Sequence, residues 1–216
     1  MQVLKVLVVA ATGGLGSSLV KEALSRGHTV SVFVRNEAKL NEELGDVLSR
    51  LAAVHVGDAR DAKSVSAACA GQDVVFSGRG ADVELARVVA EQSKAQNVKK
   101  LVFVAGGSNV MSEDGVTLQY LHMVKQYPQA EQYYRAHQPC IDAIRATGIN
   151  HVVFCPGLMR SVGHKSVPAP AIRINRPSGN FVSYEDAAAV MVHAAEVSDY
   201  DGQLITAATV VKRDGL

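Results

Sequence analysis

A buried-strand pattern that runs directly into a glycine-rich turn is the feature that most constrains this chain. Residues 4–10 form a nearly unbroken aliphatic run, as expected for a strand buried on both faces of a parallel sheet. The run leads into the turn at residues 10–16, Ala-Ala-Thr-Gly-Gly-Leu-Gly, and then into a helical pattern over residues 17–26. Strand, glycine turn and helix in this order predict a phosphate-binding loop.

The alternation of apolar runs and amphipathic segments continues along most of the 216 residues. It predicts further strands at 29–34, 53–56, 73–77, 100–105 and 150–155, with helices at 37–44, 62–70, 82–96 and 131–147. We therefore expect the α/β class and a single Rossmann domain spanning residues 1–216, with a doubly wound parallel sheet and helices on both faces.

Two long segments and the end of the chain depart from this rhythm. Residues 106–130 and 156–180 each follow the end of a predicted strand, at the edge where open α/β sheets bind ligands, so we expect substrate-side loops there; ordinary surface loops are the alternative. Ser183-Tyr184-Glu185-Asp186 is typical of a capping box and predicts a helix through residue 194. Residues 202–206 predict a last edge strand.

Composition narrows the class of partner. The chain is 48% hydrophobic and 20% charged, with a formal net charge of +1 and no basic tail. This balance favours a globular protein with a small-molecule substrate over one that binds nucleic acid or membrane. The cysteines Cys69, Cys140 and Cys155 have no metal-ligand spacing, so no metal is expected, and reduced thiols point to a cytoplasmic protein. Monomer and homodimer both remain open.

The end of the second predicted strand indicates which dinucleotide is preferred. NAD sites usually place a carboxylate there for the ribose hydroxyls, whereas Arg35 offers a guanidinium suited to a 2′-phosphate. Lys39, one helical turn later, adds a second positive charge. We therefore expect NADP (NADPH), with a solvated surface charge as the alternative interpretation of Arg35.

Further contacts to the dinucleotide are expected after the third and fourth strands. Asp58 could accept a hydrogen bond from the adenine amine, although Asp58 and Asp61 are equally suited to helix N-caps. Arg79 could clamp a phosphate. The full predicted cofactor set is Ala10, Thr12, Gly13, Gly14, Leu15, Gly16, Arg35, Lys39, Asp58, Ala59, Ser77, Gly78, Arg79, Ala105, Pro156 and Gly157.

Motifs spread over nearly the whole chain resemble a known group. They are Ala11-Thr12-Gly13-x-x-Gly16, Val34-Arg35, Gly57-Asp58, Asp73-Val74-Val75, the strand at 100–104, the segment 144–149, Pro156-Gly157 and Tyr200-Asp201-Gly202. In this order they resemble the atypical short-chain dehydrogenases/reductases, in particular the NmrA-like NAD(P)-binding members and the NADPH flavin reductase/biliverdin reductase B group. The resemblance implies a Rossmann fold and an NADP-linked oxidoreductase or regulator.

The chain departs from this pattern at positions that concern chemistry. Family members generally begin the loop with glycine, where this chain has Ala10, and carry a Ser/Thr pair where this chain has Ala105-Gly106-Gly107-Ser108. None of the six tyrosines has a lysine four residues later, the pair with which short-chain reductases commonly reduce carbonyls. The nearest pattern is Tyr133 with His137, and the candidate catalytic residues are Ser108, Tyr134 and His137. Ordinary amphipathic-helix roles are the alternative for this helix.

Two functions compete on this basis. A flavin- or quinone-like acceptor can take hydride at a conjugated ring with its proton from solvent, so an NADPH-dependent oxidoreductase acting on a small planar acceptor does not need the Tyr-Lys pair. A non-catalytic NADP-binding sensor of the NmrA-like type is the alternative, supported by the absence of that pair. A sugar-nucleotide epimerase or dehydratase is disfavoured by the same absence and by the lack of a large carboxyl-terminal domain.

Overall fold

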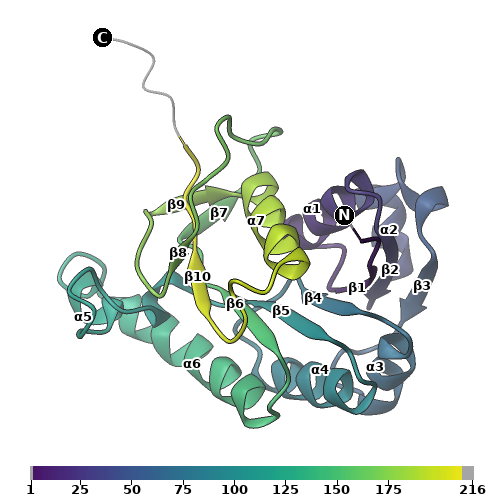
Figure 1. Ribbon diagram of the computed structural model, residues 1–216, viewed down its shortest axis with the longest axis horizontal. Helices are drawn as coiled ribbons and strands as arrows, with labels where there is room; N and C mark the ends of the chain where they lie inside the picture. The colour runs from purple at the N-terminus through teal and green to yellow at the C-terminus, as the bar shows by residue number, and fades with distance from the viewer. Residues whose placement is uncertain (1, 211–216) are drawn as a thin grey trace.

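The protein is an α/β domain built around one eight-stranded sheet (Figure 1). The computed structural model describes residues 2–210; Met1 and residues 211–216 of the predicted domain lie outside the described residues. The strand order is β3-β2-β1-β4-β5-β6-β10-β8, and every pairing except β10 with β8 is parallel. The predicted fold class, a doubly wound sheet with helices on both faces, is confirmed.

The first two thirds of the chain follow the expected alternation. Its strands are β1 (Lys5–Val9), β2 (Thr29–Val34), β3 (Ala53–Val56), β4 (Val74–Ser77), β5 (Lys100–Val104) and β6 (His151–Phe154). Its helices are α1 (Gly14–Ser25), α2 (Glu37–Leu44), α3 (Ala62–Cys69), α4 (Val83–Ala95), α5 (Gln119–Met123) and α6 (Ala130–Ala146), with short 3-10 turns η1 (Leu48–Arg50) and η2 (Gly107–Asn109).

The last third adds a helix and four short strands. These are β7 (Leu158–Arg160), β8 (Arg173–Ile174), β9 (Phe181–Ser183), α7 (Tyr184–Glu196) and β10 (Leu204–Thr206). Ser183 caps α7, as the capping-box pattern predicts, by accepting a hydrogen bond from the Asp186 N–H at 3.0 Å. The strand predicted at residues 202–206 is present as β10, but its predicted edge position is wrong, because β8 pairs with the far side of β10 and lies at the edge.

The central strands pack helices against both faces of the sheet. Along β1, Val6 and Val8 belong to the core cluster under α1, α2 and α7, whereas Leu7 and Val9 belong to the cluster under α3, α4 and α6. Figure 1 shows these helices in two layers on opposite sides of the sheet. Successive side chains from Val6 to Val9 point to opposite faces of the sheet, and all of these are aliphatic. The strand can therefore be buried on both faces, as its central position requires.

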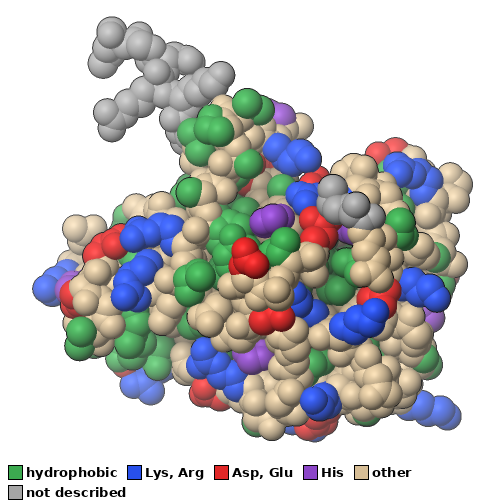
Figure 2. Space-filling view, in the orientation of Figure 1, with side chains coloured by type: hydrophobic (Ala, Val, Ile, Leu, Met, Phe, Trp, Pro, Cys, Tyr) green, Lys and Arg blue, Asp and Glu red, His purple; other side chains and the backbone are tan. Residues whose placement is uncertain are grey.

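On the face shown in Figure 2, positive and negative side chains are interspersed, without a large area of one sign. Among residues 2–210, no helix combines the length and apolar composition that crossing a bilayer requires. The same residues contain no cluster of three or more His, Cys, Asp or Glu side chains placed to hold a metal ion.

Candidate functional site

The turn between β1 and α1 is made of backbone contacts that leave no room for side chains. α1 begins at Gly14 with Gly13 as its N-cap, and no side chain of the described residues caps it. A Cβ added to Gly16 would lie 2.9 Å from the Cα of Ala11, and one added to Gly78 would lie 2.8 Å from the Cα of Gly16. The turns after β1 and β4 thus touch backbone to backbone, and the first N–H groups of α1 remain available to an anion.

Ala10 begins this turn in a left-handed conformation, with φ of +60°. Its N–H donates to the Phe33 carbonyl at 3.0 Å, and its carbonyl accepts from the Gly13 N–H at 3.2 Å. The backbone is therefore held in a region that glycine occupies without cost and alanine does not. An alanine at the position where related loops begin with glycine therefore adds backbone strain at the start of the turn. Of the other loop residues, Thr12 is half-buried, and Leu15 packs in the core.

The end of β2 carries the positive charges predicted to select the dinucleotide. Arg35 follows β2 directly, and Lys39 lies one turn into α2. Both side chains are exposed, and within residues 2–210 neither takes part in an ion pair. Asn36, between them, caps α2 by accepting from the Ala38 N–H at 2.9 Å. The structure thus leaves two cations at this strand end free to meet an anionic ligand.

The residues after β3 divide between turn formation and capping. The Asp58 carboxylate accepts from the Arg60 N–H at 2.9 Å, whereas Asp61 is the N-cap of α3 and accepts from the Ser64 N–H at 3.0 Å. Ala59 packs against the core below α3 and α4. Of these two aspartates, only Asp61 caps a helix, whereas Asp58 stabilises the turn before it.

Two arginines contact the same carboxylate and so connect the turn after β4 to the turn after β3. The Arg60 Nη2 lies 2.8 Å and the Arg79 Nε 3.5 Å from Oδ2 of Asp82, which also caps α4. Burial raises and the Arg60 hydrogen bond lowers the pKa of Asp82, and the net result lies below the ordinary value. The Ser77 hydroxyl donates to the Arg79 carbonyl at 2.8 Å, so this residue shapes the turn.

A cavity of about 540 Å³ opens at the carboxyl ends of β4, β5 and β6. Both long loops contribute to its wall, the first through residues 106–108 and through Gln119, Met123, Tyr127 and Gln129, and the second through residues 156–159 and 177–180. Ala105, Ser108, Pro156 and Gly157, all predicted to lie in the site, line it. The Ser108 side chain is buried, and its hydroxyl donates to Oδ1 of the neighbouring Asn109 at 3.1 Å.

His137 projects from α6 between the turns that follow β4 and β5. A Cβ added to Gly80 would lie 3.0 Å from the imidazole Cε1, and one added to Gly106 would lie 2.8 Å from Cδ2. The two glycines therefore admit the ring. Its Nδ1 is buried without a hydrogen-bond partner among the described residues. Burial lowers the pKa of His137, which favours a neutral imidazole at pH 7.

Two adjacent tyrosines of α6 have different surroundings. Tyr133, one helical turn before His137, lines the cavity, and its side chain is 56% exposed. Tyr134, predicted as a catalytic candidate, instead stacks on Tyr120 of α5 with ring centroids 4.3 Å apart, outside the cavity lining. Residues four apart share a helix face, so the i, i+4 spacing of Tyr133 and His137 is the sequence signal that identifies Tyr133 as the tyrosine on the cavity-lining face of α6.

The loop between β7 and β9 is anchored to the start of α7. The buried Asp186 carboxylate accepts from the Ser166 N–H at 2.7 Å, the Ser166 hydroxyl at 2.6 Å and the Thr209 hydroxyl at 2.7 Å. Glu185 accepts from the Ser161 hydroxyl and from two backbone N–H groups of the loop. Two adjacent carboxylates thus hold the loop in place.

α7 also contacts the phosphate loop. A Cβ added to Gly14 would lie 2.8 Å from Cζ of the Tyr184 ring. The first residue of α7 therefore packs against the first residue of α1, while the next two residues of α7 hold the loop between β7 and β9. No local pattern in the sequence places Tyr184 at the phosphate loop, because its contact with Gly14 joins residues 170 positions apart.

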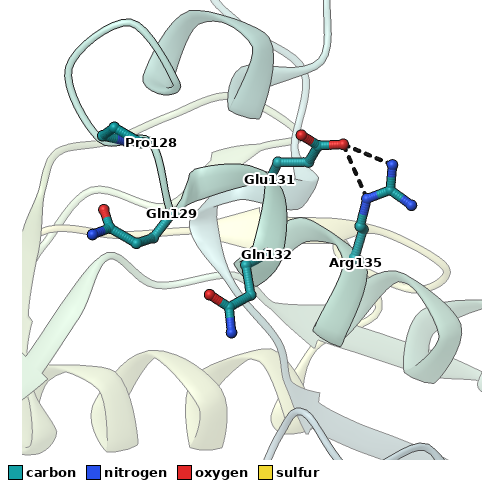
Figure 3. Close-up of a pocket in the computed structure, with 5 residues that line it drawn as sticks. All are labelled: Pro128, Gln129, Glu131, Gln132 and Arg135. Carbon is teal, nitrogen blue, oxygen red and sulfur yellow. Dashed lines mark hydrogen bonds and ion pairs between the residues drawn. The ribbon is translucent and has the colours of Figure 1, made fainter.

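A separate shallow depression lies on the first turn of α6, lined by Pro128, Gln129, Glu131, Gln132 and Arg135. Figure 3 shows Glu131 joined to Arg135 by two hydrogen bonds, at 3.0 and 2.7 Å, while Gln129 and Gln132 point away from this pair. Gln129 lines both the depression and the large cavity, whereas Gln132 lines only the depression.

Most of the chain matches a known protein family. A model of the NAD(P)H-binding family matches residues 10–197, which include the glycine turn, all the cavity-lining residues except Thr206, and α7.

Three solved structures share the fold. A candidate epimerase from Bacteroides thetaiotaomicron is 21% identical, with a TM-score of 0.80 and coverage of 98% of this chain and 100% of the other. ChuY, an anaerobilin reductase from Escherichia coli O157:H7, is 18% identical (TM-score 0.75; 97% and 99% covered). A short-chain dehydrogenase/reductase from Veillonella parvula, in complex with NADP, is 14% identical (TM-score 0.75; 94% and 93% covered).

Proposed function

Because this chain belongs to the NAD(P)H-binding family, we propose that it is an NADPH-dependent oxidoreductase that transfers hydride to a small planar acceptor of the flavin or quinone type. The observation that carries the proposal is the 540 Å³ cavity at the ends of β4, β5 and β6. It lies beside the glycine turns that suit a pyrophosphate, and it contains the buried, unpartnered Nδ1 of His137. The structural neighbour ChuY is a reductase, which agrees with this class of reaction.

The residues present fit a bound dinucleotide. The glycines of both turns leave their backbone open at the uncapped start of α1, which suits a pyrophosphate. Arg35 and Lys39 supply positive charge where a 2′-phosphate would lie, which supports NADPH over NADH. Ala105, Pro156 and Gly157 line the cavity and would border the nicotinamide. When bound, the reduced nicotinamide supplies the hydride.

The chain's own residues orient the acceptor and handle the proton. Tyr133 and His137 face the cavity from consecutive turns of α6. A neutral imidazole carries one N–H, so His137 can donate to a ribose or acceptor oxygen without a charge in the cavity. Ser108 adds a hydroxyl at the end of β5. The two loops form parts of the cavity wall, which suits the alignment of two rings that hydride transfer requires.

A non-catalytic NADP-binding sensor is the second candidate. The observation that favours it is the absence of a lysine four residues after any tyrosine in the sequence. At Tyr133 this position is taken by His137, whose pKa is lowered by burial. A neutral group cannot lower the pKa of a neighbouring phenol as an ammonium does.

Rapid mixing separates the two candidates. The protein is saturated with NADPH and mixed with riboflavin, menadione and an aldehyde, and absorbance at 340 nm reports oxidation. We expect rapid oxidation with the first two acceptors and none with the aldehyde. Tight NADPH binding without oxidation by any acceptor would establish the sensor and exclude the oxidoreductase.

A further inference from the structure

The wall of the large cavity contains no charged side chain. Among the described residues, no Asp, Glu, Lys or Arg lines it. Its ionisable members are Tyr127, Tyr133, His137 and Cys155. Burial lowers the pKa of His137 and raises the pKa of Cys155 to about 12, so the imidazole and the thiol are both neutral at pH 7. The acceptor end of the site is therefore an uncharged environment.

Arginines next to the lining segments in sequence have other partners, including Arg79, between the lining residues Gly78 and Gly80, whose Nε lies 3.5 Å from Oδ2 of Asp82. Arg160, which follows Met159, lies over the Phe181 ring at 5.1 Å from its centroid. Arg176, which precedes Pro177, donates to the Asn175 carbonyl at 2.7 Å. On α6, Arg135 pairs with Glu131. Each of these cations already has a partner that an anionic ligand would have to displace.

The lysine nearest to the lining also stays outside it. Lys125 lies between the lining residues Met123 and Tyr127, but its side chain is exposed. An ammonium in water is strongly hydrated and gains little from a distant anion across a solvated gap. Lys125 thus does not make the cavity a site for anions.

The remaining lining is suited to a flat apolar ligand. Leu158 is 78% exposed and Tyr127 is 52% exposed, and Met123 and Met159 also contribute to the wall. Aromatic rings and thioethers pack well against conjugated planes, and exposed apolar groups that line a cavity are stabilised when a ligand covers them. These residues favour an apolar ring system at the mouth as well as at the base.

We propose that the acceptor enters as an uncharged ring system and that the cavity discriminates against acceptors carrying an ionised group on the ring. This inference rests on the proposed function. An anionic substituent would lose hydration on entry and find no cation in the wall, while the phosphates of the bound dinucleotide would add repulsion.

The reaction balances with neutral species at both ends. A quinone accepts one hydride and one proton, gains two O–H bonds in the product and leaves as a neutral hydroquinone, while the nicotinamide C4–H bond breaks and NADPH is oxidised to NADP⁺. The wall offers no carboxylic acid or ammonium as the proton source. Loss of the N–H proton from a neutral imidazole would leave an imidazolate, so the proton comes from the hydroxyl of Tyr133 or from solvent.

Redox-inert ligands test the inference without turnover. Naphthalene-2-sulfonamide and naphthalene-2-sulfonate have nearly the same shape and differ in charge, and their dissociation constants are measured on the NADP⁺ complex by titration calorimetry. We expect the neutral ligand to bind at least 10-fold more tightly. Equal affinities, tighter binding of the sulfonate, or no measurable binding of the sulfonamide would overturn the inference.

A charge placed in the wall sharpens this test. Gln129→Lys adds an ammonium to the lining of the cavity, whereas Gln132→Lys adds the same charge to the shallow depression alone (Figure 3). We expect Gln129→Lys to reduce the preference for the neutral ligand at least fivefold and Gln132→Lys to change it less than twofold. An unchanged preference in Gln129→Lys, or equal changes in both variants, would contradict the inference.

Turnover distinguishes failure of this inference from failure of the proposed function. NADPH oxidation is followed with 1,2-naphthoquinone and with its 4-sulfonate. Faster reduction of the neutral quinone, by at least 10-fold in kcat/KM, supports both proposals. Equal rates overturn the charge discrimination and leave the oxidoreductase intact. No oxidation by either quinone overturns the oxidoreductase, and the binding experiment then still decides whether the cavity prefers uncharged rings.

Discussion

The glycine turns after β1 and β4 and the long loops after β5 and β6 meet at one edge of the sheet, but different interactions hold them. In the turns, Gly16 and Gly78 bring backbone into contact with backbone. In the second long loop, Asp186 and Glu185 hold residues 161–166 through side-chain hydrogen bonds. The contact between the two glycine turns thus depends on the lack of side chains at Gly16 and Gly78, whereas the second long loop depends on the presence of particular side chains. The nucleotide end of the site, at the turns, and the acceptor end, at the loops, should therefore respond differently to substitution.

The largest effect is expected where the backbone contacts leave no space. In Gly16→Ala the new Cβ would overlap the Ala10 carbonyl and lie 2.9 Å from the Cα of Ala11. Since backbone atoms cannot move aside as a side-chain end can, we expect a loss of about 3 kcal/mol in the free energy of unfolding. Urea denaturation followed by circular dichroism measures it.

Gly13→Ala is the matched control for this prediction. The nearest atom to its added Cβ is the Ala10 carbonyl oxygen at 3.7 Å, an ordinary contact. We expect a stability loss of about 1 kcal/mol or less, with weakened NADPH binding because the methyl group lies where the pyrophosphate approaches. Equal destabilisation by the two substitutions would show that backbone packing does not define the nucleotide end.

The next effect concerns the anchor of the acceptor end. Asp186→Ala removes an acceptor of three hydrogen bonds from a buried position, leaving the Ser166 N–H and two hydroxyls without it. We expect a loss of about 2–3 kcal/mol, with faster hydrogen exchange in residues 161–167 and little change in the glycine turns. Asp199→Ala, at an exposed position beyond the end of α7, is the control. Uniform exchange across the molecule would contradict a local anchor.

The same carboxylate predicts how the loop responds to acid. Burial raises and the Ser166 hydrogen bonds lower the pKa of Asp186, and the net pKa lies below its ordinary value. A lowered folded-state pKa means that the stabilisation is complete above the unfolded pKa of about 4 and is lost as the pH falls through the folded value. Protection of residues 161–167 against hydrogen exchange should therefore persist from pH 7 to pH 5 and decline below about pH 4. In Asp186→Ala this acid step should disappear.

A smaller effect is expected from the charge that selects the dinucleotide. Arg35→Ala should weaken NADPH binding about 10-fold to 100-fold, the range of about 1.5–3 kcal/mol for hydrogen bonds to charged groups, and leave NADH binding within about twofold. Fluorescence titration with both cofactors measures the change, and Lys39→Ala should show the same selectivity with a smaller amplitude. Equal affinities of the unmodified protein for NADPH and NADH would refute the 2′-phosphate assignment.

The two ends also differ in how far the sequence predicts them. Up to β6, the strands and every α-helix except α5 follow from local patterns, because aliphatic runs such as Val6 to Val9 indicate a buried strand wherever they occur. The helix α5 lies within residues 106–130, where the sequence predicts a loop. The edge strand β8 has only two residues and is defined by its partner β10, which no local pattern reveals. Tyr134 is predicted for the site from the sequence but lies outside the cavity lining. Which face of α6 meets the cavity depends on the rotation of the helix about its axis, and packing sets that rotation. The buried nitrogen of His137 likewise depends on Gly80 and Gly106, which are distant in sequence.

The smallest effect is expected at Ala10, where the phosphate loop has an alanine in a conformation that favours glycine. Ala10 has a φ of +60°, which costs about 1–2 kcal/mol for a residue with a Cβ, and glycine would lose about 0.5–1 kcal/mol through added freedom of the unfolded chain. The difference predicts that Ala10→Gly stabilises the protein by about 0.5–1 kcal/mol and raises Tm slightly.

Ala81→Gly provides the matched comparison for Ala10→Gly, because Ala81 has a φ of +54°. Both substitutions should stabilise by similar amounts, since both relieve the same conformational strain. Only Ala10→Gly should also tighten NADPH binding, because its methyl group borders the pyrophosphate turn. If both variants gain stability and neither gains affinity, the alanine methyl does not displace the pyrophosphate, and the departure at Ala10 affects the stability of the turn and not its ligand.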